Sequence, residues 1–292
     1  MLNQGRLWQT VNDLKVIKTL NNSIVHCYSE DLKREVLAFG KGIGFNVKKD
    51  EYLTKPIEKI YEIKEVKNFR DYKSLVSSVD EELVGVSEEV ISMLSKNFGG
   101  DYNERLHIAL LDHLNFAIRR RKNNLIVGNI FNDETKFMYP KEYEFSKKMV
   151  DLINNKLNID LQESEVGFIT MHIHSALNGE NIGITTIVVK IINDCLKIIE
   201  EEAKISLNDN DLSKQRLVTH LKFAVKRALD KCLLTNLIDD VVREKYKEAY
   251  EISCRLREHI KDNYCLELGG GEISYLALHI QNVVNMRREV YE

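Results

Sequence analysis

Two different hydrophobic patterns follow one another along this chain. Between residues 15 and 49, β-branched and other apolar residues form short runs separated by turn-forming residues, a pattern typical of strands. From Ile57 onward, apolar residues recur at steps of three and four, which predicts amphipathic helices. The chain is therefore expected to be multidomain, with a small antiparallel all-β domain followed by an all-α region.

The β domain is expected to hold three strands, at residues 15–20, 23–28 and 35–39. Asn21-Asn22 between the first two runs predicts a hairpin turn, and residues 29–31 predict a second turn. The stretch GKGIGF at residues 40–45 follows, and its glycines allow a bulge or the close approach of a ligand to the backbone. A β domain of about fifty residues has a thin core, so we expect it to dimerise.

The helical region contains two copies of one sequence repeat. His113 and His220 are 107 residues apart, as are His172 and His279. The segment HLNFAIRR that begins at His113 matches HLKFAVKR at His220, and FITMHI ending one residue after His172 matches YLALHI around His279. Duplication at a fixed period predicts two homologous helical bundles.

These patterns also predict where the domains begin and end. The segment Asn178-Gly179-Glu180-Asn181 is a loop signal between the two copies. We predict a leader of unassigned role at residues 1–13, a β domain at 14–66, a first helical domain at 67–180 and a second helical domain at 181–292.

Composition narrows the functional classes. The net charge is −3, but residues 15 to 55 carry eight Lys/Arg and five Asp/Glu, so the β domain is positive. The five cysteines include no Cys-x-x-Cys pair, which disfavours a disulfide framework or a thiolate zinc site. With no apolar run of about 18 residues and no signal peptide, we expect a cytoplasmic protein without membrane insertion.

The four matched histidines allow three readings. They could be core or interface residues inherited by duplication, although both pairs were kept where neighbouring apolar residues changed. A metal site is disfavoured, because no matched histidine has a partner at the four-residue helical step. A neutral imidazole beside a cation can instead accept a phosphoryl group, and Arg120 and Arg227 lie two turns after His113 and His220. His174, which matches Gln281, is expected to face solvent or an interface.

Taken together, these residues resemble the BglG family of transcriptional antiterminators, which are regulated by the sugar phosphotransferase system. The resemblance covers nearly all of the chain from Lys15 onward. The stretches VIKTLNNSIV at residues 16–25 and GKGIGF at 40–45 resemble the two signatures of the family's RNA-binding domain, which is called the co-antiterminator (CAT) domain. The family often has asparagine at the position of Ser23 and arginine at that of Lys41.

The resemblance implies a function and a set of sites. A dimer of the first domain would grip an RNA hairpin in the leader transcript of a sugar-utilisation operon, so that the overlapping terminator does not form. The two helical domains would be phosphotransferase regulation domains (PRDs), phosphorylated by the sugar-specific enzyme II and by phospho-HPr. The implied phosphorylation sites are His113, His172, His220 and His279. For RNA contact we expect Lys18, Asn21, Asn22, Ser23, Lys41, Gly42 and Phe45, because polar groups read unpaired bases and aromatic rings stack on them.

Other interpretations of these residues need different features. Turn chemistry could account for the polar RNA candidates, and Phe45 could simply be buried. A DNA-binding activator with the same regulatory domains would need a helix-turn-helix where residues 15–49 predict strands. An enzyme such as a metal hydrolase would need paired carboxylates, a nucleophile motif or ligand spacing. We therefore expect no catalytic residue, no metal site and no cofactor.

Overall fold

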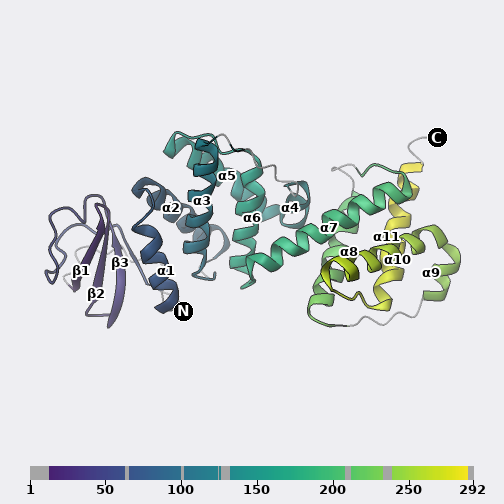
Figure 1. Cartoon of the computed structure of the whole chain (residues 1–292), viewed down its shortest axis with the longest axis horizontal. Coiled ribbons are helices and arrows are strands. Elements are labelled where there is room, and N and C mark those ends of the chain that lie inside the picture. The colour runs from purple at the N-terminus through teal and green to yellow at the C-terminus, as the bar shows by residue number, and fades with distance from the viewer. Residues whose placement is uncertain are drawn as a thin grey trace. The chain divides into compact units, whose positions relative to one another are not determined.

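The computed structural model of the chain describes residues 13–62, 66–99, 102–123, 125, 132–207, 212–232 and 239–288. A β-sheet comes first in the chain and helices follow it (Figure 1). The chain divides into two compact units. One consists of residues up to Val127 with Lys148–Gln162 and Ser175–Gly179, and the other of Gly128–Lys147, Glu163–His174 and Glu180–Glu292.

The first unit begins with a four-stranded antiparallel sheet in the order β1-β2-β3-β4. Its strands are β1 (Leu14–Asn21), β2 (Ile24–Ser29), β3 (Arg34–Phe39) and β4 (Lys59–Tyr61). The three expected strands are present, but the helical periodicity predicted from Ile57 is wrong at β4. Three residues are too few to reveal a period of two, and these become a strand by pairing with Leu37–Phe39.

The core of the sheet is small and apolar. Leu14, Val25 and Val36 are fully buried on three adjacent strands, and Ile43 and Leu53 from the following loops close over them. The pairing of β1 with β2 shifts register twice, between Val16 and Lys18 and between Thr19 and Asn21. Such bulges twist a strand and re-aim its side chains, and the second one lies directly at the β1–β2 turn.

The regular structure in the rest of the described chain is helical. The helices are α1 (Val66–Val76), α2 (Glu81–Phe98), α3 (Leu106–Lys122), α4 (Asn132–Met138), α5 (Pro140–Leu157), α6 (Ser164–Leu177), α7 (Ile182–Ala203), α8 (Leu212–Leu229), α9 (Asp239–Lys245), α10 (Lys247–Tyr264) and α11 (Gly270–Arg288). Asp80 and Asn181 cap α2 and α7, because each side chain accepts a hydrogen bond from the backbone N–H two residues later. Within the described residues, no helix combines the length and apolar character needed to cross a membrane.

In the first unit, a buried polar cluster lies between β4 and the first helices. His107 on α3 contacts both carboxylate oxygens of Glu88 on α2, at 2.9 and 3.0 Å, and the Tyr72 hydroxyl donates to the same carboxylate. Tyr61 of β4 packs edge-on against His107, with ring centroids 4.9 Å apart. Burial by itself raises the pKa of Glu88, but the charge and hydrogen bonds of His107 outweigh it and lower the pKa below its ordinary value. The cluster therefore joins α1, α2 and α3 by hydrogen bonds, and β4 packs against it through the Tyr61 ring.

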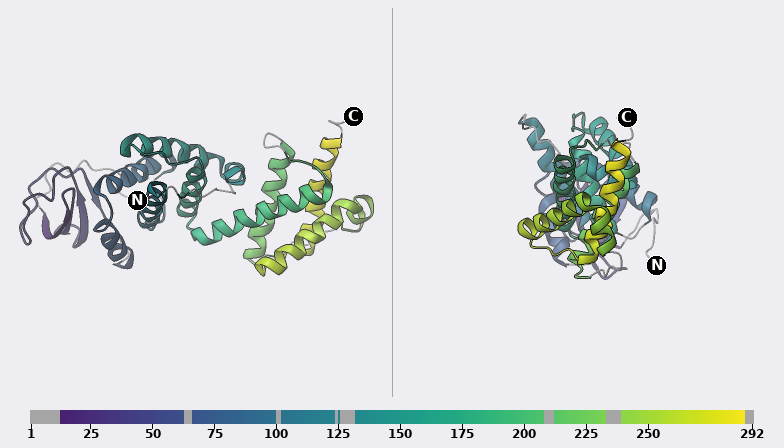
Figure 2. Two further views of the ribbon diagram at one scale, coloured as in Figure 1. Left: turned by 45° about the horizontal axis from the view of Figure 1, so that its top comes forward. Right: turned by 90° about the vertical axis from the view of Figure 1, so that its right-hand side faces the viewer.

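In the second unit, the helices α7, α8, α10 and α11 enclose one apolar core. Val189 and Ile192 on α7, Leu217 and Leu221 on α8, and Leu256 on α10 are almost fully buried within it. The helix α11, yellow in Figure 2, packs against α8 and α10 and presents Leu276, Ala277 and Ile280 to this core. Every described helix of this bundle therefore buries one apolar stripe and leaves the opposite face in solvent.

Candidate functional site

The two stretches expected to contact RNA lie side by side at one end of the sheet. The backbone N–H of Gly44 donates to the carbonyl of Asn22 at 2.8 Å, and that of Gly40 donates to Ser23 at 3.0 Å. A Cβ at Gly44 would lie 2.1 Å from the carbonyl oxygen of Asn21, so no other residue allows this close approach. The glycine loop is thus bound along the β1–β2 turn.

This juxtaposition forms a surface, here called the turn–loop surface, defined by Lys18, Asn21, Asn22, Ser23, Lys41, Gly42 and Phe45. Lys18, Asn22, Lys41 and Phe45 are exposed, and the other three are half-buried. The Phe45 ring is 61% exposed, so it is not a core residue. The buried amide nitrogen of Asn21 has no hydrogen-bond partner, while its carbonyl oxygen accepts from the Ser23 N–H. An exposed aromatic ring next to amide, hydroxyl and ammonium groups is chemistry suited to unpaired bases.

Lys55, which the sequence did not single out, supports this surface. Its ammonium donates to the carbonyls of Gly42, at 2.9 Å, and Phe45, and it lies 5.8 Å from the centre of the Phe45 ring. Its charge therefore holds the loop in shape and adds to the positive potential there. Thirteen residues separate Lys55 from Gly42, and no sequence pattern predicts that contact.

The four matched histidines all lie on helices and are all half-buried. His113 lies on α3, His172 on α6, His220 on α8 and His279 on α11. Phe116 and Phe223, three residues after His113 and His220, are 59% and 50% exposed. The two copies therefore share both the partial exposure of the histidine and an apolar surface next to it.

In the second unit, His220 and His279 are stacked, with ring centroids 3.6 Å apart. Burial, followed by the charges of His220 and Arg216, lowers the pKa of His279 from 6.5 to about 4. Burial and the charge of Arg227 also lower the pKa of His220, against an opposing effect of Glu272. Both rings are therefore neutral near pH 7, and a neutral ring nitrogen is a nucleophile.

The two arginines expected near the histidines have other partners as well. Arg227 donates two hydrogen bonds to Glu272, at 2.5 and 2.8 Å, and Glu272 is 3% exposed. This ion pair ties α8 to α11 while the charge of Arg227 still reaches His220. In the first copy, the Arg120 guanidinium lies over the exposed Phe116 ring at 4.8 Å.

The expectation that His174 faces solvent or an interface is not met within this chain. Its side chain is 12% exposed, it contacts Glu142 at 2.9 Å, and it stacks on Tyr139 at 3.7 Å. Burial raises the pKa of Glu142, but the hydrogen bond from His174 more than compensates and lowers it overall. Glu142 lies 32 residues away in sequence, which is why the local pattern did not reveal the pair.

Cavities open on the surface of the second unit, within its described residues. One, of about 320 Å³, is lined by Ser213 and Arg216 of α8 and by His279, Asn282, Asn285 and Met286 of α11. Of these only His279 was predicted, although the four-residue step from Arg216 to His220 and the three-residue step from His279 to Asn282 each mark one helix face.

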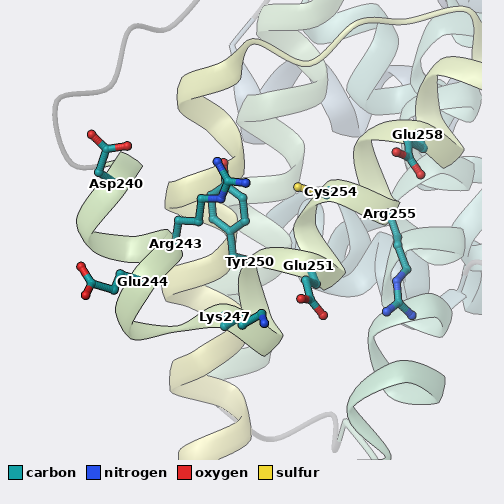
Figure 3. A pocket seen from close by; sticks show the side chains of 9 residues that line it. All are labelled: Asp240, Arg243, Glu244, Lys247, Tyr250, Glu251, Cys254, Arg255 and Glu258. Atoms are coloured by element: carbon teal, nitrogen blue, oxygen red, sulfur yellow. The ribbon is translucent and has the colours of Figure 1, made fainter.

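Another cavity, of about 630 Å³, lies along α9 and α10 and contains none of the predicted residues (Figure 3). Three of its lining side chains have partners: Arg243 lies over the Tyr250 ring, the Tyr250 hydroxyl donates to Asp239, and Arg255 pairs with Glu202. Across the described residues, no cluster of three or more His, Cys, Asp or Glu side chains is arranged to hold a metal ion.

Lowering the pH is expected to destabilise the second unit in part through His279. Its pKa is about 4 when folded and 6.5 as the ordinary value, so between these values the unfolded chain binds more protons. This contribution is complete above pH 6.5 and is lost as the pH falls through about 4. Calorimetry measures how much stability each protein loses between pH 7 and 5. This loss should be about 1 kcal/mol smaller in His279→Gln than in the wild-type chain, allowing for solvent screening. An equal loss of stability in the wild-type chain and in His279→Gln would contradict the lowered pKa of His279.

The chain matches two family models, several named relatives and a solved structure. The family model described as CAT RNA binding domain matches residues 14–69, and the PRD domain model matches residues 88–176 and 193–283. The chain is 32% identical over 275 residues to transcription antiterminator LicT of Bacillus subtilis, covering 93% of this chain and 99% of LicT. It is 30% identical over 279 residues to protein GlcT of Staphylococcus haemolyticus, covering 94% and 98% of the two chains. The crystal structure of GlcT CAT-PRDI matches with a TM-score of 0.51 and 41% identity, covering 56% of this chain and 98% of that one.

Proposed function

Because the chain belongs to the family of transcriptional antiterminators that join a CAT RNA-binding domain to two PRD domains, we propose that its turn–loop surface binds a leader-RNA hairpin under the control of histidine phosphorylation. Members of this family are RNA-binding regulators and not enzymes. The proposed domains are residues 14–66 for RNA binding and 67–180 and 181–292 for regulation.

The turn–loop surface carries the RNA half of this proposal. Two stretches that are distant in sequence are joined there by backbone hydrogen bonds, and Phe45, Lys18 and Lys41 are all exposed. An unpaired base can stack on Phe45, and the lysines offer charge to the phosphates. Binding would hold the hairpin closed, so that the overlapping terminator of a sugar-utilisation operon does not form.

The histidines carry the regulatory half. We propose that His113, His172, His220 and His279 accept phosphoryl groups from phospho-HPr and a sugar-specific enzyme II of the phosphotransferase system. Partial exposure of all four residues and the lowered pKa of His220 and His279 support this role, because the acceptor must be reachable and neutral. Arg120 and Arg227 are the cations proposed to lie nearest the added charge.

A homodimer is the proposed active form. The sheet is small, and Phe116 and Phe223 expose apolar rings one helical turn from two of the histidines. About two negative charges added at such a place would change how a second copy packs there. Because the target is a nascent transcript, the proposed location is the cytoplasm.

The test is transcription in vitro from a template that carries the leader of the neighbouring sugar-transport operon. The full chain should raise terminator read-through several-fold, and Phe45→Ala should remove most of that gain, since one base stack is worth about 1–3 kcal/mol. Tyr52→Ala, which removes an exposed ring elsewhere on the same domain, is the control and should leave read-through unchanged. Read-through that does not respond to the wild-type chain would overturn the proposal.

A further inference from the structure

The cavity beside His279 has the chemistry of an anion site. Its donors are the Arg216 guanidinium and the amides of Asn282 and Asn285, while the Ser213 hydroxyl in its lining donates to the Met286 sulfur. The Asn285 carbonyl accepts a hydrogen bond from Gln281 at 2.7 Å, which leaves its NH₂ group for an acceptor. No acidic residue lines this cavity. The volume of about 320 Å³ is larger than an anionic group of four heavy atoms, such as a phosphoryl group, requires.

The duplication shows that the arginine and the serine hydroxyl of this cavity are specific to the second copy, whereas Asn285 corresponds to Asn178 in the first. At the shift of 107 residues, Arg216 corresponds to Ala109 and Ser213 to Leu106, while the histidines themselves are kept. On α11, Asn282 corresponds to Ser175 on α6. A feature inherited only for packing would keep its apolar residues, whereas here a cation and a hydroxyl occur at positions that hold apolar residues in the first copy.

Position and charge connect Arg216 to His279. Arg216 lies one helical turn before His220, and His220 stacks on His279 at 3.6 Å. The charge of Arg216 is close enough to lower the pKa of His279. Arg227 is differently placed, because its guanidinium is already bound to Glu272 through two hydrogen bonds.

We propose that the cavity between α8 and α11 receives the phosphoryl group carried by His279, with Arg216, Asn282 and Asn285 as its positioning residues. This inference rests on the proposed function and deepens it, because it makes His279 the longer-lived acceptor of the second domain. His220 has the Arg227–Glu272 pair beside it instead, and the negative charge of Glu272 opposes an incoming phosphoryl group.

In the transfer step, His279 receives the phosphoryl group from a phosphohistidine of the donor protein. The neutral ring nitrogen of His279 attacks phosphorus, and a new N–P bond forms while the donor's N–P bond breaks. The electron pair of the broken bond stays on the donor imidazole, which gains the proton that His279 loses. The product carries about two negative charges, and the guanidinium and amide N–H groups of the cavity donate to its oxygens.

The experiment labels the full chain with phosphoramidate, a small donor that needs no protein partner, at pH 8, where His279 is neutral with or without Arg216. Peptide mass spectrometry under conditions that preserve phosphohistidine measures occupancy at each histidine and its half-life after the donor is removed. Arg216→Gln should shorten the half-life of phospho-His279 about tenfold, as expected for one charge-assisted hydrogen bond. Arg216→Lys should restore most of it.

Arg255→Gln is the matched control, since it removes an exposed arginine on α10 of the same unit and should change neither occupancy nor half-life. Circular dichroism verifies that each variant is folded. An unchanged phospho-His279 half-life in folded Arg216→Gln, or an equal loss in Arg255→Gln, would overturn the inference. Failure of the proposed function is a separate result, seen as no labelling of the wild-type chain by phospho-HPr and no effect on read-through.

Discussion

Gly44→Ala is expected to abolish hairpin binding, with affinity falling about a hundredfold, as expected when two or more base contacts are lost together. The new methyl group would lie 2.1 Å from the Asn21 carbonyl oxygen and 2.8 Å from the Thr19 side chain, so the glycine loop must move away from the β1–β2 turn. That movement separates Phe45 and Lys41 from Asn22 and Ser23. Electrophoretic mobility shift with the leader hairpin measures the loss, and thermal unfolding should show about 1–3 kcal/mol of destabilisation from overpacking.

Gly85→Ala is the matched glycine control. Gly85 lies inside α2, and a methyl group there meets no atom within 4 Å. Alanine should therefore stabilise the helix by about 1 kcal/mol and leave hairpin binding unchanged. If folded Gly44→Ala bound the hairpin as tightly as the wild-type chain, the turn–loop surface would not be the RNA contact.

The contrast between Gly44 and Lys55 shows how far the sequence could predict this surface. The glycine spacing at residues 40–45 and the Asn-Asn turn are local signals, and each was visible in a single run of residues. Their contact, and the role of Lys55 in holding the loop, depend on how the strands pair and are not encoded in any local period. The strand β4 was missed for the same reason, since three residues become a strand only by pairing with β3.

At the histidine sites too, the sequence predicted local features but not the contacts between distant residues. Duplication selected four of eight histidines, because an amphipathic pattern and its repeat can both be read along the chain. The stacking of His220 on His279 joins residues 59 positions apart, and the pairing of His174 with Glu142 joins residues 32 apart. Arg216 was overlooked because its counterpart is Ala109, so a search for features common to both copies passes over what distinguishes them.

Arg227→Gln is expected to destabilise the second unit by about 3 kcal/mol, because it leaves the buried Glu272 carboxylate without its cation. Glu272 is 3% exposed and receives two hydrogen bonds from Arg227, so little water can replace them. Calorimetry should show a melting temperature lower by roughly 6–12 °C for a unit of this size.

Two further variants separate the burial of Glu272 from a general effect of lost charge. Lys226→Gln, at the preceding position of α8, breaks an exposed pair with Glu180 and should cost at most about 1 kcal/mol. Arg227→Gln with Glu272→Gln should recover part of the loss, because no uncompensated charge then remains buried. Equal destabilisation by Lys226→Gln and Arg227→Gln would contradict a buried pair between α8 and α11. These two helices also carry His220 and His279. The strength of the Arg227–Glu272 ion pair therefore determines how firmly the two histidine rings are held together.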